Sequence, residues 1–371
     1  MGTVSYEGTL YRCLECGQSL VAGQDSLRCS QCGERYPVLR GSPRLLPRTL
    51  RASLLPETDR DCVATQVADA VTRAKLRTAA SFGFEWHRFP QLREAWERNF
   101  LDYMKPRNPG YFRGKRVLDA GCGNGRHAYY AATYGAEVLA VDLSDAIDVA
   151  RENTHQLGCV HTVQADLYNL PFELQSFDFI YSIGVLHHLP DPEGAFRNLL
   201  RYLRPGGEIQ IYLYWWPEHQ AVKRALLSAV AAARRVTTRL PHGMLYCLSY
   251  PLAAVAYAGF VAPYRLLSAL PAAAAFAERL PMKQYAAYPF QVCVNDQFDR
   301  FSAPIENRYT RAQVCGWLER GGLEEIRVLP NWGWLGSGRK SAPSHPSDRT
   351  PLSQHPRQYL RPTHREIPNV G

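Results

Sequence analysis

Short apolar runs alternate with longer segments of helical periodicity through the middle of the chain. The apolar runs are rich in Val, Ile, Leu and aromatic residues, which predicts β-strands, and the segments between them are long enough for helices that connect parallel strands. Pro205-Gly206-Gly207 predicts the end of a helix and the turn into the next strand. The pattern therefore predicts a doubly wound, mostly parallel α/β sheet, with strands at residues 116–120, 137–141, 160–164, 177–183, 208–214 and 325–329 and a helix at 311–319.

The flanking segments differ from this pattern in composition. Val63, Val67, Ala70 and Val71 have helical spacing and precede an aromatic cluster, and residues 217–285 are rich in Ala and Leu, are cut by prolines and predict a helical insertion. The end of the chain is rich in Pro, Ser, His and Arg, which predicts disorder. We expect the following divisions: 1–50, a cysteine-rich ribbon; 51–114, a helical lead-in; 115–216, the α/β core; 217–285, the insertion; 286–339, the remainder of the core; and 340–371, a disordered tail.

Two copies of Cys-x-x-Cys-Gly lie near the N-terminus. The first contains Cys13 and Cys16, and the second contains Cys29 and Cys32. Thiolates three positions apart in a tight turn can reach one ion, and four of them complete a closed tetrahedral zinc site with no open position for catalysis. Redox-active pairs or two disulfides are the alternatives, which the duplication disfavours. The spacing therefore predicts a structural zinc ribbon.

Composition and charge restrict the class of protein further. Hydrophobic residues make up 46% and charged residues 21% of the chain, which excludes a wholly disordered or fibrous protein. The first residues lack a basic start and an apolar run, so we expect no secretory signal and a cytoplasmic location. The formal net charge is +9, and residues 217–285 carry most of it, with eight Lys or Arg side chains against two glutamates. The positive charge is therefore concentrated in the insertion.

A glycine-rich segment follows the first predicted strand. Gly121, Gly123 and Gly125 allow the backbone to turn sharply and to approach a ligand at the start of the next helix. The dinucleotide fingerprint Gly-x-Gly-x-x-Gly is not matched, because position 126 is not glycine. Asp142 closes the second predicted strand and Asp166 follows the third. These carboxylates would lie at the carboxyl edge of the sheet, where open α/β sheets bind ligands.

Together with the segment Phe-Asp-Phe-Ile-Tyr-Ser-Ile-Gly-Val-Leu-His-His-Leu-Pro-Asp at 177–191, these motifs resemble class I S-adenosylmethionine-dependent methyltransferases over residues 115–214. The resemblance implies a Rossmann-like sheet of seven strands and S-adenosylmethionine as the cofactor. It also implies the following cofactor contacts: Gly121, Gly123 and Gly125 at the methionine end, Asp142 at the ribose, Asp166 at the adenine, Ile183 under the sulfonium, and Asp119 orienting the loop.

The N-terminal segment carries a second resemblance. Tyr36-Pro37-Val38 and the stretch from Gly41 to Pro47 follow the cysteine pairs. In this respect the segment is similar to a small zinc-ribbon family whose free-standing members are partner subunits of methyltransferases. The resemblance implies that such a partner is fused here to the catalytic chain.

A histidine pair follows the fourth predicted strand and supplies the candidate catalytic groups. The sulfonium is already an activated methyl donor, so a hydroxyl acceptor gains from alignment and from a general base, which typically contributes about 100-fold to 10,000-fold. His187 is the candidate base and His188 the second candidate; alternatively, both only cap or contact the following helix. The aromatic residues Phe82, Phe84 and Trp86 would form a lid over the cofactor, or pack in the core.

The insertion bears on the choice of acceptor. We expect it to form a helical cap over the acceptor pocket, with docking on a membrane surface and a single transmembrane span as alternatives. The preferred function is methyl transfer to a hydroxyl of a small or lipid-like molecule, with peripheral contact to the inner face of the membrane through residues 217–285. An rRNA or tRNA base as acceptor and a non-catalytic adaptor are the alternatives, and the net charge of only +2 over residues 1–50 disfavours nucleic acid. No sequence pattern indicates an oligomeric state.

Overall fold

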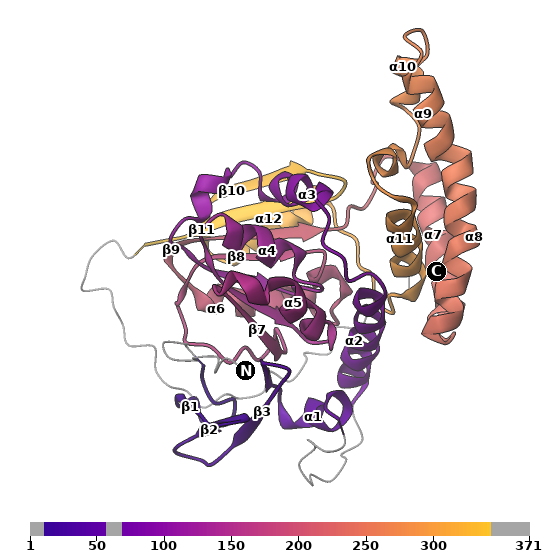
Figure 1. The fold of residues 1–371 in the computed structure, drawn as a ribbon. Coiled ribbons are helices and arrows are strands. Elements are labelled where there is room, and N and C mark those ends of the chain that lie inside the picture. The colour runs from indigo at the N-terminus through magenta and orange to yellow at the C-terminus, as the bar shows by residue number, and fades with distance from the viewer. Residues whose placement is uncertain (1–10, 57–68, 343–371) are drawn as a thin grey trace. The chain divides into compact units, whose positions relative to one another are not determined.

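The fold is taken from a computed structural model of the chain, which describes residues 11–56 and 69–342 (Figure 1). The predictions for Val63 and Val67, and for the tail from residue 343 onward, lie outside the described residues. The described residues up to Ser341 belong to one compact unit. Its centre is a mixed α/β sheet, which confirms the predicted class.

The sheet contains eleven strands in the part of the chain that the structure describes, where seven were expected. Their order is β1-β2-β3-β4-β7-β6-β5-β8-β9-β11-β10. Neighbours from β4 to β9 are parallel, whereas β1 to β4 pair antiparallel with one another and β11 pairs antiparallel with both β9 and β10. The strands are β1 (Leu20–Ala22), β2 (Ser26–Cys29), β3 (Arg35–Leu39), β4 (Ser42–Leu45), β5 (Arg116–Ala120), β6 (Glu137–Asp142), β7 (Val160–Ala165), β8 (Phe177–Ile183), β9 (Leu203–Leu213), β10 (Leu323–Pro330) and β11 (Trp334–Lys340).

The four additional strands come from the cysteine-rich segment, which continues the sheet. β4 runs parallel to β7, with Leu45 opposite Ala165. Tyr36 and Leu45 belong to the same buried apolar cluster as Leu118 of β5. A segment as small as this ribbon (residues 11–45) buries too little apolar surface to be stable alone. The apolar core that it shares with the rest of the sheet provides the additional buried surface.

Two expected boundaries were wrong. Helix α6 ends at Tyr202 and β9 begins at the next residue, so Pro205-Gly206-Gly207 lies inside β9. The pairing of β8 with β9 shifts register between Phe177 and Phe179, which accommodates these residues as an irregularity within the strand. At the other end, Lys340 belongs to β11 although the tail was expected to begin there; its ammonium donates to the backbone oxygens of Leu200 and Leu203 at 2.8 Å.

Helices cover the sheet on both faces. Helix α2 begins after Asp69, whose side chain accepts a hydrogen bond from the Thr72 amide at 2.6 Å, and it packs against α5. The helices of this part are α1 (Arg48–Leu54), α2 (Ala70–Arg88), α3 (Ala95–Met104), η2 (Pro109–Phe112), α4 (Arg126–Thr133), α5 (Ala146–Thr154), η3 (His155–Leu157), η4 (Leu186–His188), α6 (Pro192–Tyr202) and α12 (Arg311–Arg320).

The remaining helices form the helical arm, residues 221–302, in which α7, α8 and α11 lie side by side (Figure 1). Its small core contains Ala253, Val261, Tyr285, Cys293 and Val294. Because α11 packs on α7 and α8, the helical part continues past residue 285, where the insertion was expected to end. The elements are α7 (Ala221–Thr237), α8 (His242–Ala256), the π-helical segment η5 (Tyr257–Val261), α9 (Ala262–Ser268), α10 (Ala274–Ala277), η6 (Lys283–Ala287) and α11 (Phe290–Ser302).

One continuous helical stretch of the arm, His242–Ser268, is long and apolar enough to cross a membrane. This result rests on its length and composition. Only 28% of its most apolar window is buried, so most of this apolar surface faces outward. A core helix of a compact protein would bury most of such a surface.

Candidate active site

The glycine loop connects β5 to α4. At two of its glycines, any larger residue would displace the surrounding structure. A Cβ atom on Gly121 would lie 2.3 Å from Cγ2 of Val185, and one on Gly123 would lie 2.7 Å from Nε1 of Trp86. Both glycines also have positive φ, at 92° and 54°. The loop therefore passes close to the carboxyl end of β8 on one side and to α2 on the other.

Asp142 lies at the end of β6, directly against this loop. Its Oδ2 accepts a hydrogen bond from the Gly123 amide at 2.9 Å, and its Oδ1 accepts from the amide and hydroxyl of Ser144 at 2.8 and 2.7 Å. Burial raises the pKa of the Asp142 carboxyl, and these hydrogen bonds act in the opposite direction. The structure thus brings the expected ribose ligand and the glycine loop together.

Asp166 follows β7 and has a partner that the sequence did not indicate. Its Oδ2 lies 2.8 Å from the ammonium of Lys75, which α2 supplies. Asp166 is buried, and the same ammonium lies 3.9 Å from the centre of the Tyr168 ring. In this structure a lysine therefore holds the carboxylate that was expected beside an adenine.

Asp119 is buried near the end of β5, below the glycine loop. Its Oδ2 has no hydrogen-bond partner among the described residues. Burial raises the pKa of its carboxyl to about 7; interaction with the Tyr181 phenol lowers it and the charge of Asp142 raises it further. Ile183, at the end of β8, is half-buried beside the apolar cluster behind the loop.

The two histidines follow β8 and differ in their surroundings. His187 is fully buried, and neither of its ring nitrogens meets hydrogen-bond geometry with a described residue. Its ring lies 3.8 Å from that of Tyr214, between centroids. The Nδ1 of His188, by contrast, lies 2.6 Å from the backbone oxygen of Ile305, and its ring packs against Phe82 at 5.0 Å. His188 thus has a hydrogen-bond partner of good geometry, whereas neither nitrogen of the buried His187 ring has one among the described residues.

Burial also decides the protonation of His187. It lowers the pKa of the imidazole well below its usual range, the positive charge of Arg308 lowers it further, and the backbone of Tyr212 acts in the opposite direction. The ring is therefore neutral at neutral pH. A neutral imidazole can accept a proton, which a general base requires.

Helix α2 covers this edge of the sheet. Trp86 contacts the glycine loop, Phe82 contacts His188, and the guanidinium of Arg126 lies 5.3 Å from the Trp86 ring. This arrangement is the one expected of a cofactor lid, and that role stays a prediction. The aromatic residues of α2 were predicted to lie at the site, whereas its charged residues Lys75 and Glu85 were not.

Three buried or half-buried acids of α2 and α11 were also not predicted as site residues. Glu85 comes from α2, and Asp296 and Asp299 come from α11. Glu85 stands inside the aromatic segment that was noted, and the two aspartates are three positions apart, which places them on one face of a helix. That spacing was the only signal in the sequence that could have pointed to them.

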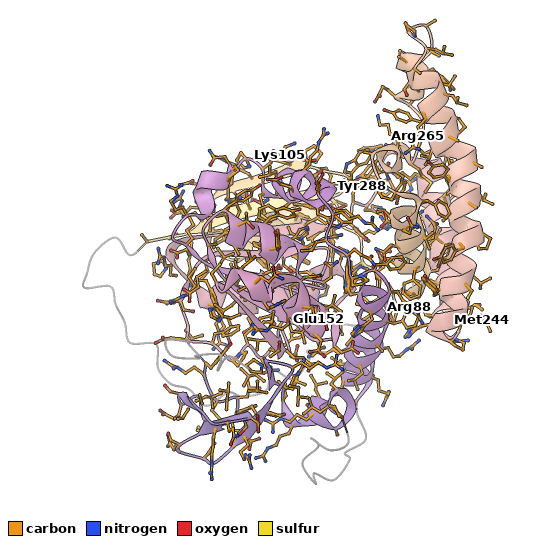
Figure 2. The ribbon with its side chains drawn as sticks, in the orientation of Figure 1. Arg88, Lys105, Glu152, Met244, Arg265 and Tyr288 are labelled. Carbon is orange, nitrogen blue, oxygen red and sulfur yellow. The ribbon has the colours of Figure 1, made fainter. Side chains whose placement is uncertain are left out.

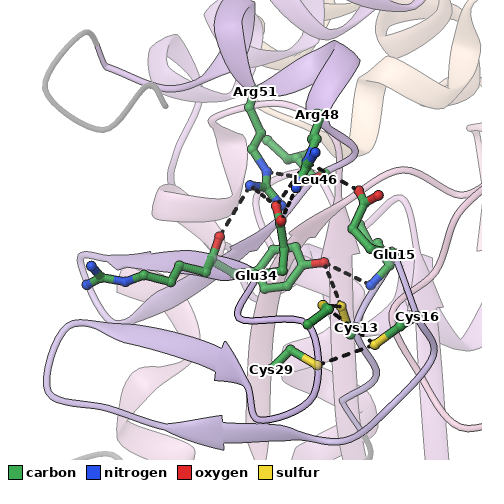
Figure 3. A network of polar contacts seen from close by, with 12 residues as sticks. Cys13, Glu15, Cys16, Cys29, Glu34, Leu46, Arg48 and Arg51 are labelled. Carbon is green, nitrogen blue, oxygen red and sulfur yellow. Dashed lines mark hydrogen bonds and ion pairs between the residues drawn. The ribbon is translucent and has the colours of Figure 1, made fainter. Parts of the chain in front are cut away.

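The four cysteines of the ribbon come together in one cluster (Figure 3). Their sulfurs all lie within 4.8 Å of one another, with Cys16 at 3.4 Å from Cys29 and Cys13 at 3.6 Å from Cys32. The phenol of Tyr36 accepts a hydrogen bond from the Leu14 amide at 2.8 Å directly behind them. This is the only group of three or more His, Cys, Asp or Glu with metal-binding spacing in the described part of the chain.

The α/β part is similar to known proteins. Residues 118–211 match the family model of a methyltransferase domain. A ubiquinone biosynthesis O-methyltransferase of Coxiella burnetii is 35% identical over 133 residues, which are 35% of this chain and 55% of that protein. A malonyl-[acyl-carrier protein] O-methyltransferase of Enterobacter lignolyticus is 36% identical over 133 residues, which are 36% of this chain and 51% of that protein. A solved S-adenosylmethionine-dependent methyltransferase from Mesorhizobium loti is 34% identical and covers 28% of this chain and 48% of that chain, with a TM-score of 0.26.

The matches show that residues 118–211 are similar to a methyltransferase domain. The chain spans about half the length of these two curated relatives. The family model matches only residues 118–211. It therefore includes neither the cysteine ribbon, which precedes these residues, nor the helical arm, which follows them.

Proposed function

We propose that this protein is an S-adenosylmethionine-dependent methyltransferase that methylates a hydroxyl group of a small or lipid-like molecule. The observation that carries the proposal is His187, which is fully buried with both ring nitrogens unpartnered among the described residues, at the same sheet edge as the glycine loop and Asp142. Both curated relatives named above are O-methyltransferases by name, which supports a hydroxyl acceptor.

The residues at the carboxyl ends of β5 and β6 fit the cofactor. The glycine loop offers backbone amides without side chains in the way, and Asp142 presents a carboxylate that can accept two ribose hydrogen bonds in exchange for its present donors. Lys75 must withdraw from Asp166 before an adenine can bind there. When bound, S-adenosylmethionine supplies an activated methyl group and leaves as a thioether.

His187 takes the hydroxyl proton as the new carbon–oxygen bond forms. Its neutral ring can accept the proton, and the face of Tyr214, 3.8 Å away, stabilises the imidazolium that results through a cation–π contact. Helix α2 above the loop excludes water from this site. The other residues of the site contribute by holding the acceptor oxygen in line with the methyl group.

The helical arm supports a lipid-like acceptor and contact with a membrane surface. Its outward face exposes Met244 (Figure 2), Leu248, Val255 and Leu266, and no Lys, Arg, Asp or Glu stands between Arg239 and Arg265. Basic side chains flank this apolar face, which suits an anionic lipid surface, and each such Lys or Arg contributes about 1 kcal/mol near that surface.

We also infer that the four cysteines hold one structural zinc ion. Sulfurs that coordinate a tetrahedral zinc ion at about 2.3 Å lie about 3.8 Å apart. Of the six distances between the four sulfurs, three are 3.4 to 3.6 Å and all are within 4.8 Å, which is close to that geometry. Elemental analysis of the purified protein should find one zinc ion per chain, and analysis that finds none would remove this inference.

The experiment that tests the function is label transfer from methyl-labelled S-adenosylmethionine into separate lipid and polar extracts. We expect the wild type to label a product, and we expect His187→Ala to lose at least about 100-fold of this transfer while it keeps its affinity for S-adenosylhomocysteine. His219→Ala, at an exposed histidine, is the matched control and should keep both. Transfer that survives in His187→Ala, or no labelled product from the wild type, would contradict the proposal.

A further inference from the structure

A short connecting segment passes the candidate base on its way from the helical arm to the α/β part. It comprises residues 303–310, between α11 and α12. The amide of Asn307 donates a hydrogen bond to the backbone oxygen of His187 at 2.9 Å, and the amide of Tyr309 donates to that of Tyr214 at 2.8 Å. The segment is therefore bonded to the backbone of both residues whose rings meet at the reacting edge, 3.8 Å apart between centroids.

Glu306 lies in the middle of this segment, and its buried carboxylate is shared by two arginines. Its Oε2 lies 2.9 Å from the guanidinium of Arg234, and its Oε1 lies 2.8 Å from that of Arg308. Burial acts to raise the pKa of the Glu306 carboxyl, but the charges of Arg308 and Arg234 outweigh it and lower this pKa. The three side chains therefore form a charged cluster, the Glu306 cluster, in which both carboxylate oxygens are occupied.

Arg234 connects the Glu306 cluster to the helical arm. It comes from α7, its side chain is only 9% exposed, and its Nε donates a hydrogen bond to the backbone oxygen of Arg300 at 3.0 Å. At the end of the same helix, the hydroxyl of Thr237 donates to the backbone oxygen of Phe301 at 2.7 Å. These oxygens belong to the last turn of α11, which has no partners for them within the helix. Helix α7 thus holds both the end of α11 and the segment that follows it.

Arg308 connects the Glu306 cluster to the candidate base. Its guanidinium lies 5.1 Å from the centre of the Tyr214 ring, a favourable contact between a cation and an aromatic face. The phenol of Tyr214 also donates a hydrogen bond to Oδ2 of Asp299, on α11, at 3.2 Å. Because Tyr214 lies one residue beyond the end of β9, its ring is positioned by the arm and the connecting segment. A continuous series of contacts thus joins α7 to the candidate base, in the order Arg234, Glu306, Arg308, Tyr214 and His187.

We propose that Arg234, Glu306 and Arg308 are positioning residues for the proposed reaction, through which the helical arm holds the Tyr214 ring against His187. The proposal rests on the proposed function, because it takes His187 to be the base. A buried ion pair is often no more stabilising than apolar residues of the same size, so stability alone does not account for this cluster. The arm then has a role in the alignment of the base as well as in contact with the acceptor.

The test is a magnetic resonance measurement on the full-length protein with isotope-labelled histidine, and it requires no acceptor. The ring of Tyr214 shifts the signal of the His187 Cε1 proton, because the two rings are in contact. That signal is identified by its loss in His187→Gln. The variant Tyr214→Leu gives the position of the signal without the neighbouring aromatic ring.

Two variants approach the cluster from its two ends. We expect Arg234→Met and Arg308→Met each to move the signal at least about half of the way to its position in Tyr214→Leu. Each leaves Glu306 with one arginine, so the buried charge keeps a partner. Arg308→Lys keeps a cation and one bond to Glu306 and should restore at least about half of the change. Arg235→Met, at the exposed neighbour on α7, is the matched control and should leave the signal unchanged.

Transfer of the methyl label should respond in the same way. Arg234→Met should lose at least about tenfold of the transfer, because a displaced base is less effective, while its affinity for S-adenosylhomocysteine stays within about twofold of the wild type. Arg235→Met should keep both.

Each other outcome decides against a part of the account. A signal that stays in place in both methionine variants overturns the proposal, and a change in Arg308→Met alone overturns the role of the arm. If one variant does not fold, the other decides; if neither folds, the cluster serves stability and the proposal is wrong. If the signal moves as expected but His187→Ala keeps its methyl transfer, the proposed function is contradicted and the series of contacts stands.

Discussion

The cysteine ribbon and the helical arm are both additions to the same α/β domain, yet they are attached in opposite ways. The ribbon continues the sheet through the pairing of β4 with β7 and shares its apolar core. It also buries an ion pair, in which the guanidinium of Arg51 lies 2.7 Å from the carboxylate of Glu34, with Arg48 as a further partner (Figure 3). The arm has a small core of its own and leaves a long apolar face exposed.

Because of this difference, we expect the ribbon to contribute to stability and the arm to contribute to binding. Apolar surface that is shared with the core contributes to the free energy of unfolding, so a change in the ribbon should affect the whole sheet. Apolar surface that stays exposed contributes little to folding and marks a surface for contact with another molecule. We therefore expect ribbon substitutions to act on stability and arm substitutions to act on acceptor or membrane contact.

The largest effect is expected from Tyr36→Ala in the ribbon. Tyr36 is fully buried, accepts a hydrogen bond from Leu14 and contacts the guanidinium of Arg51 at 4.5 Å. Its loss should lower the free energy of unfolding by about 3–5 kcal/mol, measured by urea denaturation, because a cavity opens in the shared core. Tyr250→Ala, at an exposed tyrosine of the arm, should change it by no more than about 0.5 kcal/mol. Similar losses in both variants would break the comparison.

A smaller effect is expected at the membrane. Val255 on the arm and Val21 on the ribbon are exposed by 73% and 58%. If the arm inserts its apolar face, Val255→Asp should reduce binding to anionic lipid vesicles about tenfold in sedimentation, whereas Val21→Asp should leave it unchanged. Added salt should weaken the binding of the wild type, because basic side chains contribute to it. Vesicle binding that both variants retain would show that the arm faces another partner.

A further effect, small for each pH unit, distinguishes acids of the two parts. The pKa of Asp119 in the sheet is raised from 3.8 to about 7, and that of Asp296 in the arm to about 6. The folded protein holds these protons more tightly than the unfolded chain, so the stabilisation is complete below pH 4 and is lost as the pH rises through each folded pKa. Each group changes the free energy of unfolding by at most about 1.4 kcal/mol per pH unit.

Neutral variants test this assignment by urea denaturation between pH 5 and 8. Asp119→Asn should flatten the decline up to pH 7, and Asp296→Asn should flatten it only up to about pH 6. Profiles that run parallel to that of the wild type in both variants would show that neither carboxyl holds its proton in the folded state.

The sequence was sufficient where local pattern decides the structure. The predicted strands at 116–120 and 177–183 coincide with β5 and β8, because buried parallel strands have continuous apolar runs that end at glycine or polar residues. The cluster of four cysteines was also predictable, since its spacing alone brings the sulfurs together. The ribbon's place in the sheet was not, because β4 finds β7 more than a hundred residues later through shared packing.

The candidate site shows the same limit. Asp142 and the glycine loop were predictable because the ends of neighbouring parallel strands must meet. The pairing of Lys75 with Asp166 depends on how α2 docks, and no periodicity encodes it. The charge of Asp299 likewise acts on Glu85 only after two helices that are about two hundred residues apart pack together. Contacts between distant elements therefore account for the residues that were missed.

The central claim is that the edge formed by the glycine loop and Asp142 binds S-adenosylmethionine, and calorimetry with S-adenosylhomocysteine tests it most directly. Asp142→Ala should weaken binding at least about 100-fold, because two hydrogen bonds to a charged acceptor contribute about 1.5–3 kcal/mol each. Asp145 lies in the turn between β6 and α5, three residues after Asp142, and its carboxylate is exposed. The control variant Asp145→Ala should bind as the wild type does. Unchanged affinity in Asp142→Ala, or a preference of the wild type for a nicotinamide cofactor, would contradict the account.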